Sequence, residues 1–145
     1  MTIIELITDV DALHPNGYDP AYKIQWLSQL DSRIKNDIID THEGGENIVF
    51  NGYESDVDIN TKLLVPRPYD EVYRYWLEAQ IDYLNGEYPR YNNSMAMFNT
   101  AYSAYERHYN RTHMPKGKKI KFFDHPKTKE YIAANSIAKI TLEEV

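Results

Sequence analysis

The chain has 145 residues, no cysteine and a net charge of −6. This length suits one domain with a modest core, and the missing cysteines exclude disulfides, thiolate metal sites and cysteine nucleophiles. An acidic protein is also a poor match for gripping nucleic-acid phosphates. No window approaches the roughly 18 apolar residues of a membrane span, so we expect no membrane partner.

The charge is unevenly distributed along the chain. Residues 1–60 carry 12 acidic and 3 basic side chains, which gives −9, whereas residues 61–145 carry 10 acidic and 13 basic ones, which gives +3. A solvated acidic surface with a basic tail explains this asymmetry. Opposite charges on two faces or ends would also suit head-to-tail contacts between copies of the chain.

The first forty residues predict two helices. Thr2 and Glu5 form a capping-box pattern, which predicts a short helix ending near residue 13. Asp19 and Pro20 suit the N-cap and first position of a second helix. Its apolar stripe has helical spacing and predicts a helix to about residue 42: Ile24, Leu27, Leu30, Ile34 and Ile38. Trp26 lies beside this stripe, where it could face a neighbouring molecule.

A polar, acidic segment follows. Residues 43–60 predict a loop or short hairpin, with residues 48–50 as a possible strand. Residues 61–65 form a short apolar run that could be extended, and the prolines at positions 66 and 68 predict a turn before the next helix.

Residues 68–114 predict two long amphipathic helices joined by Asn85 and Gly86, which suit a left-handed helix end. One face of the third helix consists of Val72, Trp76, Ala79, Tyr83 and Leu84. The fourth helix carries a stripe at helical spacing, namely Met95, Phe98, Tyr102, Tyr105 and Tyr109. The expected fold is mostly α, a small helical bundle with this long antiparallel helix pair and short extended segments. We expect a helical domain over residues 1–114 and a C-terminal arm over residues 115–145.

The helix pair has more aromatic side chains than one hairpin can bury. Tyrosine combines a rigid apolar ring with a polar tip, which suits protein interfaces. The side chains expected to lie partly off the core, and therefore to contact another subunit, are Trp26, Tyr73, Tyr75, Tyr88 and Tyr91.

The arm begins with interleaved basic and apolar residues, Lys118, Lys119, Ile120, Lys121, Phe122 and Phe123. Such a segment could add a strand to a partner's sheet, pair with residues 61–65 as an edge strand, or bind single-stranded nucleic acid. The acidic character of the whole chain favours a protein contact.

No pattern of catalytic or metal-binding residues is apparent. The series Glu54, Asp56, Asp58 and Asn60 resembles part of a calcium loop, but a loop that starts at Asp56 would need Gly and Glu where Thr61 and Arg67 stand. The histidines lack the spacing of a zinc set. A catalytic site could still be assembled in space from Asp82, Glu78, His108 or tyrosine side chains, yet nothing in their spacing favours one. We therefore expect no enzyme, no metal and no cofactor.

Three segments give the chain a resemblance to a known family. They are residues 23–34 (KIQWLSQLDSRI), residues 63–71 (LLVPRPYDE) and residues 83–94 (YLNGEYPRYNNS). In these segments the chain resembles the head–tail connector, or adaptor, proteins of long-tailed bacteriophages and prophages of Gram-positive bacteria. The likeness runs over roughly residues 2–114.

This resemblance implies a structural virion protein, assembled in the host cytoplasm. It implies a homo-oligomeric ring of about twelve copies beneath the portal, which joins capsid to tail and lets DNA pass without specific binding. The implied partners are the portal protein and the neighbouring connector, stopper or tail proteins. The arm, residues 118–123 and beyond, would dock on the portal.

An acidic channel lining would repel DNA phosphates, and the candidates for it are Glu54, Asp56 and Asp58. A stopper-type head-completion protein and a non-viral helical interaction module remain alternatives.

Overall fold

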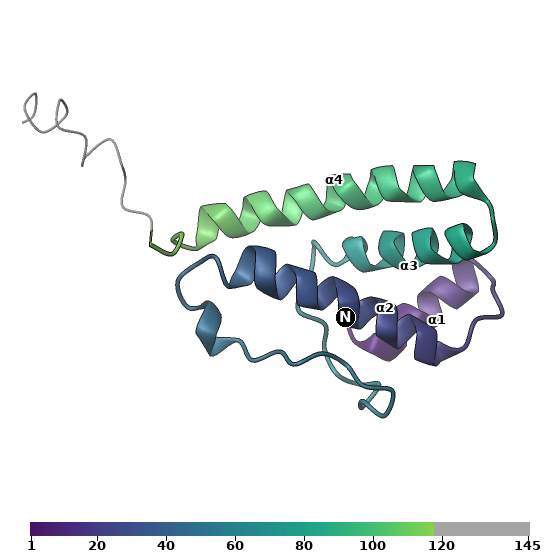
Figure 1. Ribbon diagram of the computed structural model, residues 1–145, viewed down its shortest axis with the longest axis horizontal. Helices are drawn as coiled ribbons and strands as arrows, with labels where there is room; N and C mark the ends of the chain where they lie inside the picture. Colours follow the sequence, from purple (N-terminus) through teal and green to yellow (C-terminus); the bar gives the residue numbers. More distant parts are fainter. Residues whose placement is uncertain (118–145) are drawn as a thin grey trace, which may run out of the picture. The chain divides into compact units, whose positions relative to one another are not determined.

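The computed structural model describes residues 1–117. The chain divides into two units, Met1–Met114 and Pro115–Val145, and the first of these contains four α-helices (Figure 1). They are α1 (Ile3–Leu13), α2 (Pro20–Ile34), α3 (Glu71–Leu84) and α4 (Tyr88–Thr112). Residues 1–117 contain no β-strand, which confirms the predicted mostly helical bundle.

Both N-terminal helices begin as their sequences predict. At α1, the Thr2 hydroxyl accepts a hydrogen bond from the Glu5 amide at 3.3 Å, and the Glu5 carboxylate accepts one from the Thr2 amide at 3.2 Å. At α2, the Asp19 carboxylate accepts from the Ala21 amide at 2.8 Å, and Pro20 occupies the first turn. These side chains satisfy amide groups that have no partner inside the helix.

The second helix extends beyond α2 through a π-helical turn, η1 (Lys35–Ile39). Its last bond runs from the Asp40 amide to the Lys35 carbonyl at 2.8 Å. Gly44 then takes a φ of 87°, a left-handed conformation that favours glycine. A short 3₁₀ turn, η2 (Gly45–Asn47), follows. The predicted helix to about residue 42 is therefore confirmed, with a change of winding that sequence periodicity does not reveal.

Helices α3 and α4 form the predicted antiparallel pair, and Figure 1 shows them side by side and joined at one end. Gly86 makes the turn possible with a φ of 74°. Its amide donates to the Tyr83 carbonyl at 3.1 Å, and the next amide, of Glu87, donates to the Asp82 carbonyl at 2.9 Å. These bonds close the C-terminal end of α3 and set the direction in which α4 starts.

One hydrophobic core joins the helices. α1 contributes Ile3, Leu6, Ile7 and Val10, while α2 and η1 contribute Ile24, Leu27, Leu30, Ile34, Ile38 and Ile39. The hairpin contributes Val72, Leu77, Ile81, Phe98, Tyr102, Tyr105 and Tyr109. Burial of such side chains contributes about 1.5–3 kcal/mol each. The predicted stripe of α4 is confirmed, except that Met95 is only half-buried.

The long connection from residue 48 to residue 70 departs from the prediction. The possible strand at residues 48–50 does not form, because Ile48 and Val49 are exposed and have no neighbouring strand. Residues 61–63 are extended but pair with the chain start, through bonds from Ile3 to Thr61 at 3.1 Å and from Leu63 to Met1 at 3.1 Å. A single antiparallel bridge, between Thr2 and Lys62, results.

The predicted inner face of α3 is partly wrong. Tyr83 and Leu84 are 53% and 54% exposed. Helical periodicity gives the direction in which a side chain points, but burial also requires an element that reaches the same height along the helix. Both side chains belong to the last turn of α3, beside the connection to α4.

Candidate functional site

An exposed aromatic patch lies at the turn between α3 and α4. It consists of Tyr83, Leu84, Tyr88 and Tyr91, and we call this set the aromatic patch. The Tyr83 ring lies 5.8 Å from the Tyr88 ring and 5.3 Å from the Tyr91 ring. Tyr88 is 56% exposed. The rings contact one another, yet Tyr83 and Tyr88 remain more than half exposed.

The connection between α1 and α2 braces this turn. The Tyr18 hydroxyl donates to the Asn85 side-chain oxygen at 2.7 Å. His14 Nε2 lies 2.8 Å from a carboxylate oxygen of Asp82, a residue that is only 1% exposed. Both contacts join residues far apart in sequence, so they hold in place the turn that carries the aromatic patch.

The Asp82 carboxylate is the centre of a small polar cluster. Arg90 Nε lies 3.9 Å from the oxygen that faces His14, and the Ser94 hydroxyl donates to the other oxygen at 3.3 Å. Glu78 and Asn93 complete the lining of a hollow of about 140 Å³. A buried carboxylate needs such partners because its desolvation is costly. The cluster therefore fastens the α1–α2 connection to the hairpin.

The cluster brings together two residues named as possible catalytic groups, Glu78 and Asp82, but with His14 in place of His108. The His108 ring stacks instead on Tyr69, with ring centres 4.6 Å apart. Ser94 donates to the carboxylate and does not contact the imidazole as a nucleophile would. Within residues 1–117, no group of three or more acidic or histidine side chains could hold a metal ion.

Two of the five predicted interface aromatics are core residues, so the prediction that they lie off the core is wrong. Tyr73 has no exposed surface, and Trp26 is 9% exposed. The Trp26 ring meets Tyr18 edge-on at 6.2 Å, and its carbonyl accepts from the Trp76 indole at 2.9 Å. Helical spacing predicts that both residues lie beside the core stripe. In the structure, the loop 53–65 covers Tyr73, and the segment around Tyr18 covers Trp26.

The other three aromatics lie at least partly on the surface. Tyr88 and Tyr91 belong to the aromatic patch. Tyr75 is half-buried, and the Arg74 guanidinium lies 4.7 Å from its ring centre. That contact is intramolecular and covers one face of the ring.

The buried Tyr73 belongs to a carboxylate network that sequence reasoning missed. Asp31 accepts hydrogen bonds from the Tyr73 hydroxyl at 2.6 Å, the Tyr53 hydroxyl at 2.5 Å and the Leu64 amide at 3.3 Å. The Tyr73 hydroxyl accepts from the Val65 amide at 2.7 Å. The network holds the loop 53–65 against α2 and α3. The one sequence signal was a lone aspartate between two core positions of α2, Leu30 and Ile34.

Burial controls the protonation of this network. Desolvation raises the pKa of Asp31 above 3.8, and the hydrogen bonds from the two tyrosines oppose that rise. Burial also raises the pKa of Tyr53 and Tyr73 well above 10.0, and the adjacent Asp31 charge raises them further. The hydroxyls therefore remain neutral donors to the carboxylate.

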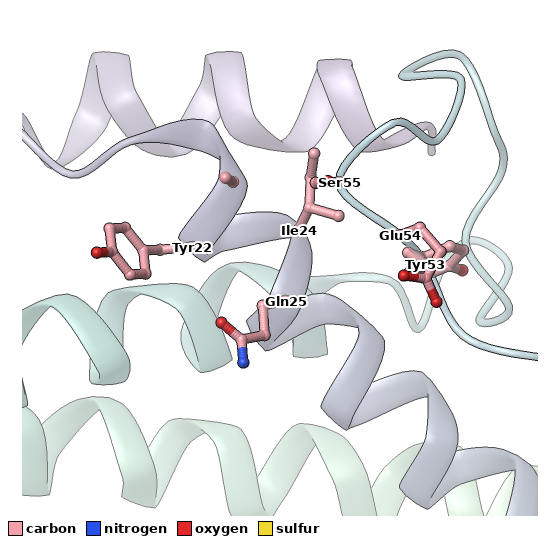
Figure 2. Close-up of a pocket in the computed structure, with 7 residues that line it drawn as sticks. Tyr22, Ile24, Gln25, Tyr53, Glu54 and Ser55 are labelled. Atoms are coloured by element: carbon pink, nitrogen blue, oxygen red, sulfur yellow. The ribbon is translucent and has the colours of Figure 1, made fainter.

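The predicted acidic loop residues Glu54, Asp56 and Asp58 are all exposed. Asp58 accepts from the Asn60 amide at 3.0 Å and shapes a turn. Beside the loop lies an open hollow of about 350 Å³, lined by Tyr22, Ile24 and Tyr53 among others. Figure 2 shows that α2 supplies one side of this hollow and the loop 53–55 supplies the other.

The arm residues Lys118, Lys119, Ile120, Lys121, Phe122 and Phe123 lie outside the described residues. Among residues 1–117, no helix has the length and apolar character needed to cross a membrane. No family model, no curated protein and no solved structure matches the chain.

Proposed function

We propose that this chain is a head–tail connector of the adaptor type, a structural protein that forms a ring beneath a phage portal and joins it to the tail. The aromatic patch carries the proposal. Tyr83, Leu84 and Tyr88 are more than half exposed, and they lie on a turn that is fixed by Gly86, Asn85 and the Asp82 cluster. A rigid patch of this kind reduces the entropy cost of binding another protein.

The architecture supports the adaptor over the stopper alternative. Stopper rings tend to be β-rich, whereas residues 1–117 form helices with one isolated bridge. The longest of the described helices, α4, has 25 residues and extends about 37 Å at 1.5 Å per residue.

The polar cluster supports a structural role over a catalytic one. The Asp82 carboxylate accepts a hydrogen bond from the Ser94 hydroxyl, and its other oxygen, which has no hydrogen-bond partner within residues 1–117, lies 2.8 Å from His14 Nε2. These contacts join the α1–α2 connection to the hairpin. We propose that the cluster holds these two segments together and that the protein acts through its surfaces.

A non-viral helical interaction module is the second candidate, because the same aromatic patch would serve it. The two candidates differ in the partner. An adaptor binds the portal ring encoded in its own genome, whereas another module has no affinity for that ring.

Sedimentation of the full chain with purified portal rings tests the proposal. We expect the wild-type chain to sediment with the rings, and Tyr83→Ser combined with Tyr88→Ser to weaken this binding at least tenfold. Val49→Ser, which changes a 79% exposed apolar residue outside the patch, is the matched control and should bind normally. Failure of the wild-type chain to sediment with the rings would reject the adaptor function.

A further inference from the structure

Two surfaces of opposite charge lie at opposite edges of the described unit. One is the acidic loop around Glu54 and Asp56, and the other is the last two turns of α4 with Arg107 and Arg111. Figure 1 shows α4 along one edge of this unit and the connection that contains residues 54–58 along the other, with α2 between them. The two surfaces therefore do not meet within one molecule.

The acidic surface adjoins a place where a side chain could be buried. Glu54 and Asp56 are exposed and form no ion pair with any residue from 1 to 117. Glu54 also lines the hollow of about 350 Å³. Tyr22, Ile24 and Tyr53 contribute apolar surface to the hollow, and Gln25, Glu54 and Ser55 contribute polar surface (Figure 2). The site thus combines negative charge with a lining that is apolar in part.

The basic surface has the complementary composition. Arg107 and Arg111 are four residues apart, so they lie on the same side of α4. Both are exposed, and neither pairs with an acidic group in the described part of the chain. Met114 follows the helix and is 58% exposed. An unbranched methionine adapts to irregular apolar sites and contacts aromatic rings favourably.

We propose that the hollow and its acidic rim bind the α4 end of a second copy of this chain. Arg107 and Arg111 of one copy face Glu54 and Asp56 of the next, and Met114 enters the hollow between Tyr22 and Tyr53. The contact joins two different surfaces, so it is heterologous, and its repetition forms a ring when the rotation from copy to copy closes. The inference rests on the proposed ring-forming function and assigns Glu54 and Asp56 to the subunit contact in place of the channel lining.

The physical character of the contact determines the test. Exposed ion pairs are individually weak and are screened by salt. The association of free copies should therefore weaken as salt rises, and it should depend on the apolar residue as well as on charge. Reversal of both charges on one surface turns attraction into repulsion, whereas reversal on both surfaces restores attraction.

The experiment uses sedimentation velocity on the full chain at low salt without any portal. We expect concentration-dependent association of the wild type, and at least a tenfold loss of affinity for E54K/D56K and for R107E/R111E alone. An equimolar mixture of these two variants should associate again, because each supplies one reversed surface that matches the other. Asp9→Lys, at an exposed acidic residue of α1, is the matched control and should associate as the wild type does. Met114→Ser should weaken association without changing its salt dependence.

A wild-type chain that remains monomeric at low salt at every concentration tested would overturn the inference. So would unchanged association of both charge-reversed variants, or a mixture that fails to associate. Because no portal is present, these results are independent of portal binding. A chain that binds portal rings but shows no charge-dependent self-association would keep the proposed function and lose this contact.

Discussion

The hydroxyl of Tyr73 donates a 2.6 Å hydrogen bond to the carboxylate of Asp31, and neither side chain is exposed to solvent. The two residues are 42 positions apart in sequence. Their contact joins α2 to α3, and through Tyr53 and Leu64 it also fixes the loop that carries the acidic residues. The geometry of the proposed subunit contact therefore depends on a buried polar network.

Removal of the Tyr73 hydroxyl should destabilise the fold. Tyr73→Phe leaves one oxygen of Asp31 and the Val65 amide without their partner. An unsatisfied buried polar group costs about 1–3 kcal/mol, so we expect a loss of that size in the free energy of unfolding, measured by urea denaturation. Tyr83→Phe removes an exposed hydroxyl and should change the free energy by less than about 0.5 kcal/mol. Equal stability of both variants would contradict the network.

The stability contribution of Asp31 should depend on pH in a defined direction. Burial raises the pKa of its carboxyl in the folded chain above 3.8. Between pH 3.8 and that raised pKa, the folded state binds more protons than the unfolded state, so the contribution of this group increases as pH falls. We expect the difference in unfolding free energy between the wild type and Asp31→Asn to grow in favour of the wild type on acidification through this window. A difference that shrinks would show that the folded pKa is lowered instead.

Alkaline pH should destabilise the fold through buried tyrosines. Desolvation raises the pKa of Tyr105 in the folded chain above 10.0. Above pH 10 the unfolded chain loses this proton first, so stability falls as pH rises. Tyr105→Phe removes one such group, and its unfolding free energy should fall less steeply above pH 10 than that of the wild type. Parallel curves for the two proteins would contradict the assignment.

The contact between His14 and Asp82 should appear as a coupling energy. Each single change, His14→Ala or Asp82→Asn, removes one side of a 2.8 Å contact at a buried carboxylate. We expect the single variants to lose about 1–3 kcal/mol each, and the double variant to lose at least 0.5 kcal/mol less than their sum. Additive losses in a double-mutant cycle would mean that the two side chains do not interact.

The helices were predictable because their signals are local. Thr2 and Asp19 cap the helices that they precede, Gly86 ends α3, and the spacing of Phe98, Tyr102 and Tyr105 gave the buried face of α4. Each of these features depends on residues within a few positions of one another. These local signals were therefore sufficient to predict the helices from the sequence.

The polar contacts between distant segments were not predictable. Asp31 lies among apolar positions of α2, and its partners are 22, 33 and 42 residues away. For the same reason, the sequence did not predict the burial of Tyr73 and Trp26, because this burial depends on segments that are distant in sequence and have no regular structure. The exposure of Tyr83 and Leu84 likewise depends on which segments pack against the end of α3. Periodicity describes one helix and contains no information about the extent of its partners.

The most direct test of the proposed function is negative-stain electron microscopy of the full chain mixed with portal rings encoded by the same genome. The adaptor function predicts an added ring of density on one end of the portal, whose rotational symmetry gives the number of copies. The Tyr83→Ser and Tyr88→Ser double variant should leave most portals bare, while Val49→Ser should decorate them as the wild type does. Bare portals in the presence of micromolar wild-type protein would contradict the adaptor function and leave the interaction-module alternative.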